Sequence, residues 1–282
     1  MIAVIGAAGQ LGSAFSAVLG ADCLPLTRSD IDLEDTAVIC PTIQSLDVDA
    51  VINCAAYTAV DQAEEDELRA FAVNATAVGE LATTCHQSGK RFVTFSTDYV
   101  FDGAKAGPYT ESDQPNPLGV YGHTKLEGER LALASHPESL VVRTSWVLSG
   151  THRNFAATML RLIGEGPVQV VDDQIGHPTL VDDLASKVLA CLEEDVAGVL
   201  HLANQGTVSW YQLARECADI AGLDASVVTP CRTEDFPRPA PRPRNSVLDS
   251  ERLSGLGLPE MPHYRPGLEK AIDQLRAAAS SA

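Results

Sequence analysis

Short apolar runs alternate with longer amphipathic runs through the first half of the 282-residue chain. The apolar runs have the length and residue types of buried strands, and the runs between them repeat apolar residues at helical spacing. Such repetition with short turns builds a parallel sheet covered by helices on both faces. We therefore expect strands near residues 2–5, 21–26, 49–54, 91–96 and 139–144, and helices near 10–19, 35–45, 67–88 and 119–135.

This regular alternation loosens after about residue 146. Residues 168–179 suggest a strand leading into a turn, and residues 198–204 suggest a further strand of the main sheet. Helical spacing recurs at 154–164, 180–195, 209–223 and 267–280. We expect a nucleotide-binding domain made of residues 1–146 with about 180–204, and a smaller region made of residues 147–179 and 205–282.

The composition excludes several classes of protein. A net charge of −18 repels polyphosphate backbones, so nucleic-acid binding is not expected. No segment has the long unbroken apolar stretch that a membrane helix needs, and the start lacks the basic residues of an export signal. We expect a cytoplasmic protein whose seven scattered cysteines hold neither a zinc ion nor a disulfide framework.

The sequence GAAGQLG follows the first expected strand and opens the first expected helix. Gly6 allows a tight turn, Gly9 allows the backbone to approach a pyrophosphate, and Gly12 allows close packing of helix on strand. This pattern predicts a dinucleotide site. After the second strand, Arg28 favours the 2′-phosphate of NADPH, but Asp30 and Asp32 follow at once, and an acidic residue there favours the 2′-hydroxyl of NADH, so the sequence leaves both cofactors open.

Tyr121 and Lys125 lie four residues apart in a helical segment, so they share one face. A phenol with its usual pKa near 10 is a poor acid–base catalyst at neutral pH, and we expect the Lys125 ammonium to lower that pKa. Ser96, Thr97 and Asp98 follow the fourth strand, at the sheet edge where ligands bind. The Thr97 hydroxyl is therefore a candidate donor to a substrate oxygen.

These motifs together resemble the extended short-chain dehydrogenase/reductase superfamily. Further stretches are similar to the dTDP-4-dehydrorhamnose reductase family: NCAAYTAVDQAE, STDYVFDG, RTSWV, DDQIGHPT and RPRNSVLD. The resemblance covers nearly the whole chain. It implies an α/β fold with a Rossmann-like doubly wound parallel sheet and a smaller C-terminal substrate-binding region. It also implies that NADPH or NADH reduces the C4 ketone of dTDP-4-dehydro-6-deoxy-L-mannose to give dTDP-L-rhamnose.

The resemblance assigns roles to matching residues. Tyr121 would donate the proton, Lys125 would activate it and hold the nicotinamide ribose, and Thr97 would bind the reacting oxygen. Asp98 and Trp146 would contact the sugar. Asn74 would lie behind the residues that contact the ligand and would hold them in position. The implied cofactor-binding residues are Gly6, Gly9, Gln10, Leu11, Gly12, Arg28, Asp32, Leu33, Ala55, Ala56, Tyr57, Asn74, Tyr121 and Lys125.

The proline-rich segment 236–245 carries Arg238, Arg242 and Arg244. Because the protein is acidic, a sugar nucleotide with two phosphates needs local cations, and the guanidinium group matches phosphate oxygens. We expect at least one of these arginines, with Arg242 as the first candidate, to bind the diphosphate of the dTDP-sugar substrate.

Some members of the resembled family bind magnesium at a dimer interface through carboxylates, one of them early in the first helix. Here Ala14 stands at that place, so we expect no metal and a monomer or weak homodimer. Two alternatives to the reductase stay open. One is a non-catalytic nucleotide-binding regulatory subunit, and the other is a sugar-nucleotide epimerase or dehydratase of the same superfamily.

Overall fold

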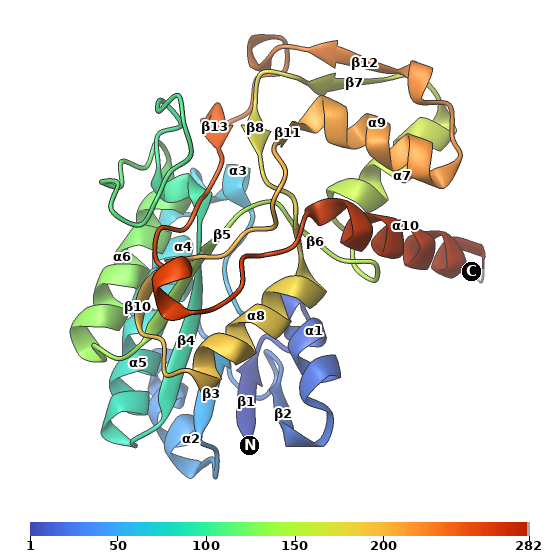
Figure 1. The fold of residues 1–282 in the computed structure, drawn as a ribbon. Coiled ribbons are helices and arrows are strands. Elements are labelled where there is room, and N and C mark those ends of the chain that lie inside the picture. The colour runs from blue at the N-terminus through green and yellow to red at the C-terminus, as the bar shows by residue number, and fades with distance from the viewer. Residues whose placement is uncertain (281–282) are drawn as a thin grey trace.

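The computed structural model describes residues 1–280, and a six-stranded parallel sheet forms its centre (Figure 1). The spatial order is β10-β5-β4-β3-β1-β2, and every neighbouring pair is parallel. The strands are β1 (Ile2–Ile5), β2 (Cys23–Leu26), β3 (Ala50–Asn53), β4 (Arg91–Thr97), β5 (Leu140–Thr144) and β10 (Gly198–His201). The expected α/β class and its doubly wound sheet are confirmed.

The chain leaves β1 toward β2 on one side and returns to β3 on the other, so the winding reverses between β1 and β3. A crevice opens at such a reversal, outside the carboxyl ends of the strands. The topology therefore places the ligand site at the ends of β1, β3 and β4, where the sequence carries the glycine turn, Ala55 and Thr97.

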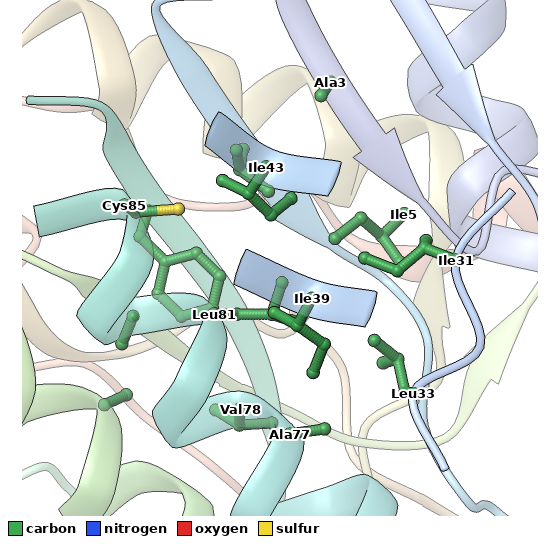
Figure 2. Packing of buried hydrophobic residues seen from close by; sticks show 14 of the residues in the cluster. Ala3, Ile5, Ile31, Leu33, Ile39, Ile43, Ala77, Val78, Leu81 and Cys85 are labelled. Carbon is green, nitrogen blue, oxygen red and sulfur yellow. The ribbon is translucent and has the colours of Figure 1, made fainter. Parts of the chain in front are cut away.

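Helices cover both faces of the sheet (Figure 1). One face is packed by α1 (Gln10–Leu19) and α8 (Val181–Glu193), and the other by α2 (Ile39–Ser45), α5 (Ala77–Gln87) and α6 (Val120–Ser135). Figure 2 shows Ile39 and Ile43 of α2 packed with Leu81 and Cys85 of α5. The central strands are apolar on both sides because both sides are buried.

The expected continuous helix at 67–88 is wrong in one respect. The chain forms α4 (Glu67–Phe71), a π-helical turn over Ala72–Thr76, and then α5. Asn74 in this turn donates from Nδ2 to Thr124 Oγ1 of α6 over 3.1 Å. A π turn adds one residue to a helical turn, and contacts of this kind hold it in place. Apolar spacing does not report such an insertion.

The C-terminal half adds a smaller group of elements beside the sheet, in the upper right of Figure 1. Its helices pack on one another and on a two-stranded sheet of β7 and β12. Its elements are α7 (Phe155–Glu165), β7 (Val168–Val171), α9 (Trp210–Ala221), β12 (Val228–Cys231) and α10 (Tyr264–Ser280). The division into two domains at the expected boundaries stays a prediction.

The expected strand leading into a turn over 168–179 begins with β7, and the chain beyond it forms two further short strands, β8 (Ile175–Gly176) and β9 (Thr179–Leu180). Each piece pairs with a different partner, which a local pattern cannot specify. The partners are β12 for β7, β11 (Val208–Ser209) and β13 (Asn245–Ser246) for β8, and β6 (Val147–Leu148) for β9. The short helix α3 (Val60–Ala63) follows β3. No helix within residues 1–280 combines the length and apolarity that crossing a membrane requires.

Candidate active site

A cleft of about 790 Å³ opens at the carboxyl edge of the sheet. It is lined by the glycine turn after β1, by the segments after β2 to β5, and by the first turns of α6. Sequence positions more than a hundred residues apart thus share one cavity. The lining contains these residues that the sequence singled out: Gly6, Gly9, Gln10, Leu11, Arg28, Ala55, Ala56, Thr97, Asp98, Tyr121, Lys125 and Trp146.

A smaller hollow of about 170 Å³ adjoins this cleft beyond β2. The two share Gly6, Arg28 and Ala55 in their linings. The smaller hollow adds Asp32 and Leu33, which the resemblance places beside the adenine, and Tyr57, which it places near the middle of the cofactor. The two hollows together have the extended form that a dinucleotide requires.

The glycine turn is built for close approach of backbone. Gly6 has a φ of +76°, and a Cβ there would lie 2.8 Å from the Ala55 nitrogen. Gly9 is the N-cap residue of α1, and no side chain within the described residues caps this helix. The first N–H groups of α1 therefore lie beside the cleft without a side-chain partner, which fits a pyrophosphate. The residues present thus suit a dinucleotide cofactor.

Gly12 does not line the cleft but lies beneath the turn. A Cβ on Gly12 would lie 2.2 Å from the Gly6 carbonyl oxygen, so the backbone itself would have to move. Gly12 therefore allows the helix to pack on the turn, as the spacing predicts.

We expect Gly12→Ala to lower the free energy of unfolding by about 1–3 kcal/mol, the usual cost of overpacking, and to weaken dinucleotide binding. Urea unfolding and titration with NADPH measure both effects. Gly164→Ala in α7 is the matched control, because nothing lies within 4 Å of its added Cβ. Equal stability of the two variants would contradict the packing role of Gly12.

Two polar side chains hold the walls of the cleft together. Gln10 Oε1 accepts hydrogen bonds from Ser149 Oγ at 2.9 Å and Asn154 Nδ2 at 3.1 Å, so it ties the glycine turn to the C-terminal half. Asn74 is buried outside the cleft, and its Oδ1 accepts from the Tyr57 nitrogen at 2.9 Å. Asn74 thus links the segment after β3 to α6.

Thr97 and Asp98 lie at the end of β4 and face the cleft. Thr97 Oγ1 donates to Asp98 Oδ1 over 3.0 Å and accepts from the Tyr99 nitrogen over 3.2 Å. The other carboxylate oxygen, Asp98 Oδ2, has no hydrogen-bond partner among residues 1–280. Burial raises the pKa of Asp98 to about 6. A buried acceptor without a partner suits a sugar hydroxyl.

Tyr121 and Lys125 both line the cleft from α6, and Lys125 is 5% exposed. The expected lowering of the Tyr121 pKa by Lys125 is wrong for this structure. Burial raises the pKa of Tyr121 above its usual range, and the charge of Asp98 adds to the rise. Burial also lowers the pKa of Lys125 to about 8, while Glu129 opposes that shift. Removal from water therefore dominates the pKa of both groups, and the phenol stays protonated at neutral pH.

Trp146 faces the cleft in an unusual backbone conformation, with a φ of +47°. Its ring stacks on Trp210, with centroids 3.5 Å apart and planes at 11°. Trp210 also lines the cleft and begins α9. Sequence reasoning missed Trp210, because only the packing of α9 against the segment after β5 brings the two indoles together.

Arg242 lies outside the main cleft, in a second hollow of about 990 Å³. Tyr99 and Trp210 line both hollows, so the two adjoin. The guanidinium of Arg242 pairs with Asp61 Oδ1 at 2.9 Å and donates to the Ala240 carbonyl at 2.7 Å. Arg238 lines the same hollow, with its guanidinium 4.6 Å from the Phe236 ring centroid. The second hollow thus has apolar walls and two cations.

Within residues 1–280, no group of three or more histidine, cysteine or acidic side chains is arranged to hold a metal ion. The cleft itself brings together the Tyr121 phenol, the Lys125 ammonium, the Thr97 hydroxyl and the Asp98 carboxyl group. That set can donate a proton to a carbonyl oxygen and stabilise the charge that develops on it.

Comparison with known proteins agrees with this arrangement. Residues 1–277 match the model of the RmlD substrate binding domain family. A dTDP-4-dehydrorhamnose reductase of Mycobacterium tuberculosis is 46% identical over 281 residues, covering 96% of this chain and 92% of that protein. Two solved structures carry the same name. The one from Clostridium acetobutylicum is 38% identical, with a TM-score of 0.94 over 98% of this chain and 99% of that one.

The second is from Bacillus anthracis and was solved in complex with NADP. It is 33% identical, with a TM-score of 0.93 over 97% of this chain and 98% of that one. The agreement extends over the glycine turn, the Tyr–Lys helix and the C-terminal half. The chain therefore belongs to the RmlD substrate binding domain family, together with the dTDP-4-dehydrorhamnose reductases that it resembles along nearly its whole length.

Proposed function

We propose that the protein reduces the C4 ketone of dTDP-4-dehydro-6-deoxy-L-mannose to dTDP-L-rhamnose with NADPH or NADH. The observation that carries this proposal is the convergence of Thr97, Tyr121 and Lys125 on one cleft with the glycine turn. The adjoining hollow beside Arg242 supplies room for a nucleotide at the open end. The relatives named above support the same activity.

When bound, the nicotinamide would supply a hydride, and the protein residues stabilise the negative charge that develops on the ketone oxygen. As negative charge develops on the ketone oxygen, the Tyr121 hydroxyl donates its proton to that oxygen. Thr97 Oγ1 donates a hydrogen bond to the same atom, turning from its present acceptor Asp98. The raised pKa of Tyr121 keeps the donor protonated before reaction. The Lys125 ammonium stabilises the phenolate that remains afterwards.

Asp98 and Trp146 would bind the sugar. Asp98 Oδ2 offers a free acceptor to a sugar hydroxyl, and the stacked indoles of Trp146 and Trp210 form an apolar wall of the cleft. The experiment that tests the function mixes the protein with the nucleotide sugar and reduced cofactor and follows the absorbance of the reduced nicotinamide. Consumption in proportion to ketone supports the proposal. A regulatory subunit would bind the cofactor without consuming it, and an epimerase or dehydratase would show no net consumption.

Arg242 is proposed to bind the substrate diphosphate. We expect Arg242→Ala to raise KM for the nucleotide sugar by about 10- to 100-fold with little change in kcat, because a charged hydrogen bond is lost and Asp61 is left to repel the phosphates. Steady-state kinetics at saturating cofactor measure this. Arg161→Ala on the exposed side of α7 is the control. An unchanged KM would remove Arg242 from the site.

We also propose that the protein acts in the cytoplasm as a monomer or weak homodimer that needs no magnesium. Ala14 supports the last point, because a methyl group cannot bind a metal ion. Light scattering of the purified protein, with magnesium and with a chelator, tests the assembly. A stable dimer that dissociates with the chelator would contradict the proposal. Cell fractionation tests the location.

A further inference from the structure

Three charged side chains meet at the smaller hollow beyond β2. Arg28 follows β2, Glu34 lies in the next loop, and Arg69 comes from α4. Arg69 places Nε at 2.9 Å and Nη2 at 2.7 Å from Glu34 Oε1, and Arg28 pairs with the same oxygen. Two guanidinium groups thus converge on one carboxylate oxygen.

The cluster lies where a dinucleotide would place its adenosine ribose. The hollow shares Gly6 and Arg28 with the main cleft, and it continues past Leu33 and Tyr57. In this class of sheet, the residues after the second strand contact the ribose 2′ position. Arg69 is also fixed from a second side, since its guanidinium lies 5.8 Å from the Tyr57 ring centroid.

Two guanidinium groups around one oxygen form a cradle for an anion. A guanidinium group binds phosphate through paired N–H donors, and two of them can hold a phosphate monoester from two sides. Glu34 currently fills the cradle, and both arginines lower the pKa of its carboxyl. Its side chain is 32% exposed, so it has room to turn outward.

We propose that Arg28 and Arg69 together recognise the 2′-phosphate of NADPH, and that Glu34 occupies their cradle until the phosphate displaces it. The inference rests on the proposed cofactor site and adds Arg69 and Glu34 to it. Selectivity between NADPH and NADH then depends on a competition between two anions for the same cations. With NADH, Glu34 stays in the cradle, so the site accepts both cofactors.

Neighbouring acids limit the selectivity. Asp32 Oδ2 lies 3.4 Å from the Arg28 guanidinium, and Asp66 Oδ2 lies 3.8 Å from that of Arg69. Both carboxylates repel an incoming phosphate. Because the cluster is half exposed, each ion pair is weakened by water. We therefore expect changes of about tenfold rather than a complete switch of cofactor.

The test is calorimetric titration of the full-length protein with 2′,5′-ADP, which carries the 2′-phosphate, and with 5′-AMP, which does not. We expect Arg69→Met to weaken 2′,5′-ADP binding about tenfold and to leave 5′-AMP binding unchanged. Glu34→Gln should strengthen 2′,5′-ADP binding by roughly 3- to 10-fold, because it removes the competing charge. Arg28→Met provides a second variant with the same expected direction as Arg69→Met.

Glu165→Gln is the matched control, because Glu165 also pairs with an arginine, Arg161, but on the exposed side of α7. It should change neither affinity. Unchanged 2′,5′-ADP binding in Arg69→Met would overturn the inference. So would a Glu34→Gln variant that weakens 5′-AMP, since Glu34 would then bind the ribose itself. Failure of the wild-type protein to bind either nucleotide would overturn the proposed cofactor site as well.

Discussion

Replacing Tyr121 with phenylalanine is expected to lower kcat for ketone reduction by about 10²- to 10⁴-fold, which is the rate enhancement that general acid catalysis usually contributes. The substitution keeps the ring that lies 5.5 Å from that of Tyr99 and removes only the hydroxyl group. Without it, the developing negative charge keeps one hydrogen bond, from Thr97, and receives no proton. Steady-state assays with saturating cofactor and nucleotide sugar measure the loss.

Cofactor affinity separates this chemical effect from a collapse of the site. Titration with NADPH should give the same affinity for Tyr121→Phe as for the wild-type protein. Tyr211→Phe removes the hydroxyl of a tyrosine on α9 that lines none of the hollows described above, and it should leave kcat unchanged. If Tyr121→Phe reduces the ketone at the wild-type rate, the proton comes from another group and the proposed role of Tyr121 is wrong.

Arg143→Met is expected to lower the free energy of unfolding by about 3–5 kcal/mol, the typical cost of removing one partner of a buried ion pair. Arg143 of β5 binds Glu129 of α6 through two hydrogen bonds of 2.9 and 2.7 Å. The side chains of Arg143 and Glu129 are 4% and 5% exposed. The variant would leave the Glu129 carboxylate buried without its cation. Urea unfolding followed by circular dichroism measures the loss.

The double variant Glu129→Gln/Arg143→Met distinguishes charge from packing. It removes both charges, so most of the lost stability should return. Arg130→Met, whose guanidinium pairs with Glu127 on the surface of α6, should cost less than about 1 kcal/mol. A loss that persists in the double variant would show that Arg143 acts through packing, for instance against the Phe101 ring at 5.2 Å.

The ion pair also bears on catalysis. Glu129 lies one helical turn after Lys125, and its charge raises the pKa of the ammonium that burial lowers to about 8. Arg143 holds that carboxylate in place from β5. The same contact thus fixes α6 against the sheet and keeps a negative charge near Lys125.

Much of the architecture follows from local pattern. Apolar runs bounded by turns predict all five strands of the first half within a few residues, and 198–204 supplies the sixth. A buried strand or helix shows its buried face in its own sequence, because each position contacts either core or solvent. The packing of Gly12 is equally local, since its Cβ would meet Gly6 and Ala7 of the same strand–turn–helix unit, whereas Gly6 lies against Ala55 after β3.

The electrostatics of the cleft could not be obtained this way. Tyr121 and Lys125 share a helix, which predicts a mutual effect on their pKa values. In the folded chain burial instead raises the pKa of Tyr121, with the charge of Asp98 adding to the rise, and burial lowers the pKa of Lys125, with Glu129 opposing the fall. The loss of water around a titratable group depends on every element packed against it. The spacing of two residues on one helix is therefore not enough to predict their pKa values.

The amino-acid order was therefore sufficient to place the strands, the covering helices, the glycine turn and the Tyr–Lys face, because the pattern that predicts each of them lies within a short stretch of chain. Three features required the folded chain: the indole stack of Trp146 on Trp210, the pairing of Arg242 with Asp61, and the arginine cradle around Glu34. Each joins residues from separate elements. The order of the strands and the angles at which the helices pack decide which of these residues meet. The spacing of residues along the chain does not predict that geometry.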